Sequence, residues 1–138
     1  MILIDSSAWY ALADNRERHH GDAVRLFARV TKGEFGRILT TDYVLDETYT
    51  LLRMRLGIGP VRALRDLLTG SSNLQMVRVS ERDFDHAVEL MLNQADKRWS
   101  LTDCTSFVLM RELEISRAFT FDHNFSEAGF QVLPAQNP

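Results

Sequence analysis

The chain has 138 residues, of which 45% are hydrophobic and 25% are charged, and its formal net charge is −3. These proportions are typical of one globular domain and exclude a disordered chain, while the negative charge argues against a generally basic nucleic-acid binder. No apolar run approaches the roughly 20 residues that a membrane span needs. The single Cys104 excludes an internal disulfide, which predicts a cytoplasmic protein in a reducing compartment.

Short apolar runs alternate with amphipathic segments along the chain. Residues 1–4 are apolar and lead directly into Asp5, as expected for a strand buried on both faces of a parallel sheet. Further strands are expected at residues 37–41, 74–79, 117–121 and 130–133. Helices are expected after Ser6 or Ser7 and at residues 19–31, 43–56 (capped by Asp42), 61–68, 80–92 and 100–113. The alternation predicts one α/β domain over residues 1–138, with a parallel sheet of about five strands and a frayed tail at 134–138.

Four carboxylates stand out by their positions. Asp5 and Asp122 each follow an apolar strand directly. Glu47 lies on the apolar face of its helix, whereas its neighbour Asp46 lies on the polar side. Because strand carboxyl ends and the starts of the following helices share one edge of a parallel sheet, these acids are expected to converge in one cleft. Asp103 joins them if its helix begins at that edge.

Like charges at such close range repel each other and raise each other's pKa values. A divalent cation relieves this repulsion, and a set of oxygen ligands alone suits Mg²⁺ or Mn²⁺ rather than Zn²⁺. Cations held by acids in this way serve phosphate chemistry, in which one ion activates a water and a second stabilises the leaving oxygen.

Three of the acids also have a purely structural interpretation. Asp103 completes a possible capping box with Ser100, Asp122 can form an Asx turn, and Asp5 can cap the first helix. Glu47 has the weakest structural interpretation, because an inward carboxylate in mid-helix is rarely buried without a partner.

The remaining polar and aromatic residues are expected to be structural or to surround the cleft. His19 and His20 point to different sides of a helix and are expected at the surface, as is His123 in a turn. Cys104 is expected to be a packed residue with no role in catalysis. Core packing is the default for most of Trp9, Tyr10, Leu12 and Tyr49, and an apolar surface for a partner is the alternative. The candidates to hold phosphates beside an acidic cleft are the cations Arg53, Arg55, Arg62, Arg65, Lys97 and Arg98.

Four sequence motifs resemble those of PIN-domain nucleases. They are residues 2–7 (ILIDSS), 41–47 (TDYVLDE), 100–107 (SLTDCTSF) and 120–125 (TFDHNF) followed by Gly129 and Phe130. The resemblance implies a three-layer sandwich with helices on both faces of a sheet of order 3-2-1-4-5. It also implies a Mg²⁺- or Mn²⁺-dependent ribonuclease, with Ser7 and Thr102 as polar groups behind the acids. The catalytic and metal-binding residues implied are Asp5, Glu47, Asp103 and Asp122.

The size of the chain resembles that of VapC-type toxins of toxin–antitoxin pairs. This implies an RNA substrate, an antitoxin partner that covers the cleft, and a homodimer. The expected reaction is hydrolysis of an RNA phosphodiester by water, which leaves a 5′-phosphate and a 3′-hydroxyl.

Other classes are less consistent with the sequence. A receiver-like protein would need a lysine after the last strand, where none follows Phe130. A haloacid-dehalogenase-like enzyme would need a second aspartate where Ser7 stands. A PIN-like module that binds RNA or protein without cutting remains an alternative, and the sequence leaves open the RNA and the number of metals.

Overall fold

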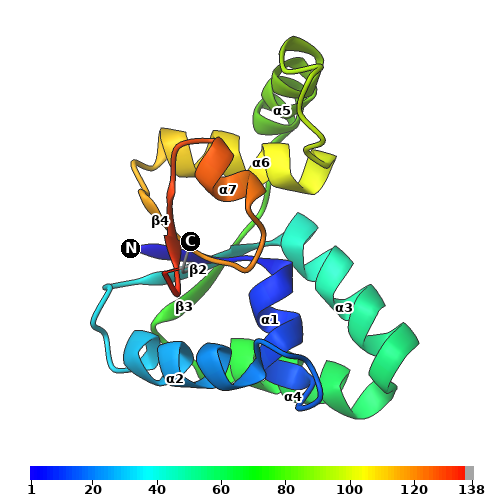
Figure 1. The fold of residues 1–138 in the computed structure, drawn as a ribbon, viewed down its shortest axis with the longest axis vertical. Coiled ribbons are helices and arrows are strands. Elements are labelled where there is room, and N and C mark those ends of the chain that lie inside the picture. Colours follow the sequence, from blue (N-terminus) through cyan, green and yellow to red (C-terminus); the bar gives the residue numbers. More distant parts are fainter. Residues whose placement is uncertain (136–138) are drawn as a thin grey trace.

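Five parallel strands form one sheet of order β3-β2-β1-β4-β5 in the computed structural model, which describes residues 1–135 (Figure 1). They are β1 (Ile2–Ile4), β2 (Ile38–Thr41), β3 (Leu74–Val77), β4 (Arg117–Phe119) and β5 (Gln131–Leu133). The expected parallel sheet and its strand order are confirmed. Of the tail expected at 134–138, residues 136–138 lie outside the described residues.

Helices cover both faces of the sheet, as in the expected three-layer sandwich (Figure 1). One face carries α1 (Ser6–Ala13), α2 (His20–Thr31), α3 (Asp42–Leu56) and α4 (Ile58–Gly70). The other face carries α5 (Glu81–Asn93), α6 (Leu101–Glu112) and the short α7 (Asn124–Glu127).

The central strand β1 is buried on both faces. Ile2, Leu3 and Ile4 are each 0% exposed. Ile2 and Ile4 pack in one core cluster with Trp9, while Leu3 packs in the other with Phe107. Because successive side chains of a strand point to opposite faces, both layers require apolar residues here. The residue that follows β1, Asp5, therefore emerges at the carboxyl edge of the sheet.

Two strands end earlier than the sequence predicts. β3 ends at Val77, which pairs with Thr41, the last residue of β2. β4 ends at Phe119, which pairs with Ile4, the last residue of β1. Both partner strands turn into helices immediately afterwards, so the residues beyond these points have no strand beside them. Residues 120–122 therefore leave the sheet at the edge where Asp5 lies.

The start of α3 differs in its cap. Thr41, rather than Asp42, is the N-cap, because its hydroxyl accepts a hydrogen bond from the Val44 N–H at 3.0 Å. The Asp42 carboxylate instead accepts one from the Val79 N–H at 2.9 Å. This bond ties the start of α3 to the segment after β3.

Helix α4 begins at Ile58, earlier than expected, so Pro60 lies in its first turn, where a missing N–H costs no helical hydrogen bond. Gly57 separates α3 from α4 with φ = 96°, a conformation that favours glycine. Within residues 1–135, none of the helices has the length and apolar character to cross a membrane.

Candidate active site

The four acids predicted from the sequence line one cleft with a volume of about 490 Å³. Asp5 comes from the end of β1 and Glu47 from the second turn of α3. Asp103 comes from the first turn of α6, and Asp122 from the segment between β4 and α7. The expected convergence at the carboxyl edge of the sheet is therefore observed.

Asp5 is the most deeply buried of the four, with 3% of its surface exposed. Its Oδ2 accepts hydrogen bonds from Thr120 Oγ1 at 2.9 Å and Ser7 Oγ at 3.1 Å. Asp5 is also the N-cap residue of α1, as the capping interpretation expects, but its side chain makes no capping hydrogen bond. Burial raises the pKa of Asp5 to about 6, more than the hydrogen bond from Thr120 lowers it, and the charge of Asp103 raises it further.

Glu47 is half-buried and has a hydroxyl partner from α1. Ser6 Oγ donates to its Oε1 at 2.7 Å, which links the start of α1 to α3. The neighbouring Asp46 is exposed, as expected for a solvated surface charge. The inward position of Glu47 is thus matched by a neutral donor.

Asp103 has the structural role and the cleft position together. Its Oδ2 accepts from the Ser100 N–H at 3.1 Å, and its own N–H donates to Ser100 Oγ at 3.0 Å, so the predicted capping box is present. The same Oδ2 accepts from the Asn124 amide at 3.1 Å. Burial is the largest cause of a raised pKa for Asp103, and the charge of Asp122 adds to it.

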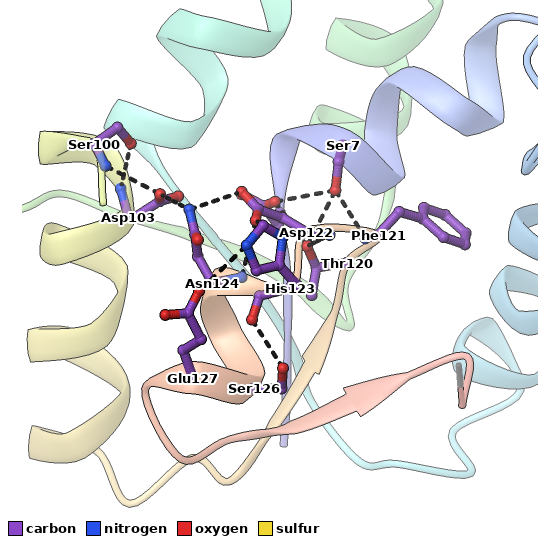
Figure 2. Close-up of polar contacts among 11 residues, drawn as sticks. Ser7, Ser100, Asp103, Thr120, Phe121, Asp122, His123, Asn124, Ser126 and Glu127 are labelled. Atoms are coloured by element: carbon purple, nitrogen blue, oxygen red, sulfur yellow. Dashed lines mark hydrogen bonds and ion pairs between the residues drawn. The ribbon is translucent and has the colours of Figure 1, made fainter. Parts of the chain in front are cut away.

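Asp122 forms the predicted Asx turn, in which its Oδ1 accepts from the Asn124 N–H at 2.9 Å. The side-chain amide of Asn124 also donates to Asp122 Oδ2 at 3.5 Å. Figure 2 shows the Asn124 side chain lying between Asp103 and Asp122. A neutral double donor therefore separates two carboxylates.

Two hydroxyls fix the segment after β4 beside Asp5. Ser7 Oγ lies 3.1 Å from Thr120 Oγ1 and accepts from the Phe121 N–H at 2.9 Å (Figure 2). Thr120 Oγ1 accepts from the Asp122 N–H at 3.0 Å. Ser7 lies as expected behind the acid, whereas Thr102 does not line the cleft. The sequence did not predict a role for Thr120. Its position directly after an apolar strand and two residues before Asp122 is the signal that could have indicated one.

The donors in the cleft suit a hard cation, but the side chains are not yet arranged around one. All four acids offer carboxylate oxygens, which Mg²⁺ and Mn²⁺ prefer. Among residues 1–135, no group of three His, Cys, Asp or Glu side chains is placed so that it could hold a metal ion. The chemistry of the site therefore fits a divalent cation, while its geometry requires the carboxylates to approach each other.

Only two of the six candidate cations line the cleft, Arg55 and Arg98. The Arg55 guanidinium lies over the Tyr10 ring, 5.2 Å from its centroid. Lys97 instead pairs with Glu127 at 3.5 Å. Helical periodicity did not distinguish Arg55 from its neighbours, because the cleft is formed by segments far apart in the sequence.

His19 lies at the start of α2 and is partly exposed, as expected. The sequence did not predict that its ring lines the cleft and stacks on Phe121. His123 is exposed in its turn as expected, Cys104 is buried, and Trp9 packs in the core.

These features define a class: a parallel α/β domain with an acidic cleft where the central strands end. The family model described as PIN domain matches residues 2–131, and the chain belongs to the PIN-domain family. It is 34% identical over 130 residues to the 23S rRNA-specific endonuclease VapC20 of Mycobacterium tuberculosis, covering 94% of this chain and 95% of that protein. It is 27% identical over 125 residues to a VapC ribonuclease of Archaeoglobus fulgidus, covering 90% of this chain and 78% of that protein.

Solved structures show the same fold. The crystal structure of M. tuberculosis VapC20, described as a Sarcin-Ricin loop cleaving toxin, matches with a TM-score of 0.86 at 32% identity, covering 94% of this chain and 96% of that one. FitAcB of Neisseria gonorrhoeae matches with a TM-score of 0.65 at 13% identity, covering 96% of each chain. The second likeness concerns the fold alone.

Proposed function

We propose that residues 1–138 form a single PIN domain that acts as a metal-dependent endoribonuclease, the toxin of a type II toxin–antitoxin pair. The observation that carries this proposal is the cleft that Asp5, Glu47, Asp103 and Asp122 reach from separate segments. Like charges repel, so packing alone gives no reason to gather them. The names of the relatives at 34% and 27% identity, an endonuclease and a ribonuclease, support the same activity.

The four carboxylates would hold one or two Mg²⁺ or Mn²⁺ ions. When bound, a divalent cation supplies a water of lowered pKa and a positive charge beside the phosphate. The raised pKa values of Asp5 and Asp103 mark the places where such a charge is most needed. In the protein without metal, Asn124 offsets part of the repulsion between Asp103 and Asp122.

The chain's own residues orient the acids and the substrate. Ser7 and Thr120 fix the Asp5 carboxylate, and Ser6 fixes Glu47. Arg55, on the wall of the cleft, attracts the RNA backbone toward the acids. No side chain acts as the nucleophile, so water attacks phosphorus in line and the products carry a 5′-phosphate and a 3′-hydroxyl. Cys104 cannot serve instead, because burial raises the pKa of its thiol to about 11.

The substrate that we propose is the sarcin–ricin loop of 23S rRNA. VapC20 is described both as a 23S rRNA-specific endonuclease and as a Sarcin-Ricin loop cleaving toxin, and it matches 94% of this chain in sequence and in structure. A cognate antitoxin would bind over the acidic cleft and block it, and the toxin would form a homodimer. These partners rest on the likeness to VapC proteins.

The ends of the products test this chemistry. A hairpin RNA with the sarcin–ricin loop sequence, incubated with the protein and Mg²⁺, should yield a 3′ fragment that a 5′-phosphate-dependent exonuclease degrades. A 5′ fragment that ends in a 2′,3′-cyclic phosphate would contradict the mechanism, because it requires attack by the ribose 2′-hydroxyl instead of water.

The alternative is a PIN-like module that binds RNA or protein without cutting. It is favoured by one observation, that no group of three acidic or metal-binding side chains in residues 1–135 is arranged for a metal. Calorimetric titration with Mn²⁺ separates the two proposals. A metal-dependent nuclease should release or absorb heat on binding Mn²⁺, and Asp5→Asn should abolish that signal. A non-cutting module should give the same result with and without the substitution.

A further inference from the structure

An aromatic pair forms one wall of the acidic cleft. The rings of His19 and Phe121 are stacked, with centroids 4.4 Å apart and planes 9° from parallel. Both residues line the cleft and both are partly exposed. In Figure 2 the Phe121 ring extends away from the carboxylates, on the side of Ser7 and Thr120.

Phe121 is held by the same network that holds the acids. Its N–H donates to Ser7 Oγ at 2.9 Å, and it lies directly between Thr120 and Asp122. Its ring and that of the buried Phe119 meet edge to face, with centroids 6.3 Å apart. Its position is therefore fixed relative to Asp5, which accepts from the hydroxyls of Ser7 and Thr120.

His19 is held from two sides but makes no capping bond to α2. Its backbone N–H donates to Glu17 Oε2 at 2.6 Å, and its ring Nε2 accepts from Arg18 Nε at 3.1 Å. The needs of the helix therefore do not explain its ring position. The ring instead stacks on one face of Phe121, which holds the Phe121 ring at the cleft wall.

Flat aromatic faces beside a phosphate-binding site suit nucleobases. Proteins bind single-stranded nucleic acid by stacking bases on aromatic side chains while cations follow the backbone. Loops and unpaired nucleotides of RNA are recognised in this way because their bases can leave the helix. Here the cation Arg55 and the aromatic pair line the same cleft as the acids.

We propose that the His19–Phe121 pair is a base-stacking subsite for the nucleotide next to the bond that is cut. This inference rests on the proposed ribonuclease function and adds to it a binding site for an unpaired base. Phe121 contacts the base, and His19 is a positioning residue that stacks on the opposite face of the Phe121 ring and holds it in place.

Substitution of Phe121 by leucine provides the first test, because it retains much of the apolar volume and removes the aromatic face. In steady-state cleavage of the sarcin–ricin hairpin, Phe121→Leu should raise KM roughly 5- to 100-fold. Phe121→Tyr should stay close to the wild type. The Mn²⁺ concentration that gives half-maximal activity should not move, since the acids are retained.

Phe35→Leu is the matched control. Phe35 is also a partly buried aromatic residue, and it lies beneath the Arg29 and Arg117 guanidinium groups at 5.4 and 5.5 Å. It does not line the cleft. Its substitution should leave KM unchanged, so a general loss of packing cannot account for an effect at Phe121.

Abasic nucleotides identify the contact itself. Replacing the bases beside the cleaved bond one at a time should lower kcat/KM of the wild type strongly at one position. The same abasic RNA should not lower kcat/KM of Phe121→Leu any further, because this variant already lacks the aromatic ring on which the base stacks. Equal penalties in wild type and variant at every position would overturn the subsite, and so would a shifted Mn²⁺ midpoint in Phe121→Leu with an unchanged KM. A wild-type protein that neither binds nor cuts the hairpin would overturn the proposed function as well.

Discussion

Asp5 is a carboxyl group in a place where burial disfavours its charge. Its pKa rises from 3.8 to about 6, chiefly through desolvation. At about 1.4 kcal/mol per pKa unit, the ionised group costs the metal-free protein about 3 kcal/mol at neutral pH. A bound cation would offset this penalty, because its charge stabilises the carboxylate in place of the lost hydration.

Asp5→Asn should therefore stabilise the protein in the absence of metal. Below pH 4 the carboxyl is protonated in both the folded and the unfolded state, so the two proteins should differ little. Between pH 4 and pH 6 the folded wild type retains its proton while the unfolded chain releases it, so wild-type stability falls as pH rises. Urea unfolding in EDTA from pH 4 to pH 8 measures the difference. A wild type that gains stability relative to Asp5→Asn with rising pH would contradict the account.

Asn124→Ala removes the amide that donates to both Asp103 and Asp122. The metal-free variant should lose about 1–3 kcal/mol of unfolding free energy, because both carboxylates lose a hydrogen bond from the amide. Its affinity for Mn²⁺ should rise, since the cation no longer has to displace the amide. Calorimetry measures both effects. Asn73→Ala is the control, as the Asn73 amide donates to the Gly36 carbonyl away from the cleft. Weaker Mn²⁺ binding by Asn124→Ala would show that the amide helps to hold the metal.

At the scale of elements, the first turn of α6 combines a cap with a cleft residue. Ser100→Ala should cost about 1 kcal/mol of stability, as N-cap losses do, and should also lower cleavage because Asp103 loses part of its support. Ser80→Ala is matched to it, since the Ser80 hydroxyl accepts from the Asp83 N–H at 3.1 Å at the start of α5. Its unfolding free energy should fall by a similar amount, with cleavage unchanged. Equal loss of cleavage in both variants would show that Ser100→Ala acts through overall stability and not through the support of Asp103.

The order and type of the elements could be predicted from the sequence because apolar runs and helical periodicity are local signals. The run of Ile2 to Ile4 shows burial on both faces, and the Ser100 capping box is visible as a motif. The ends of β3 and β4 could not be predicted, because they depend on where the neighbouring strands turn into helices. The cap at Thr41 could not be predicted either, since Asp42 is recruited by the distant Val79 N–H.

At the scale of the whole molecule, the topology accounts for the cleft. Strand order β3-β2-β1-β4-β5 places the ends of β1 and β4 side by side, so Asp5 and Asp122 line one cleft although they are distant in sequence. Sequence position was enough to predict that Asp5, Glu47 and Asp122 share an edge, and that Asp103 joins them if its helix begins there. It could not predict the His19–Phe121 stack, because the contact joins the start of α2 to the segment after β4 and leaves no local pattern.

A single assay decides whether these acids form a metal-dependent ribonuclease site. Cleavage of the sarcin–ricin hairpin is measured for wild type and Asp5→Asn, each in EDTA, Mg²⁺ and Mn²⁺, after circular dichroism has shown that both are folded. The wild type should cleave the RNA with either metal but not in EDTA, and Asp5→Asn should not cleave it under any condition. Equal cleavage by the two proteins, or undiminished cleavage in EDTA, would contradict a metal-dependent site at these acids.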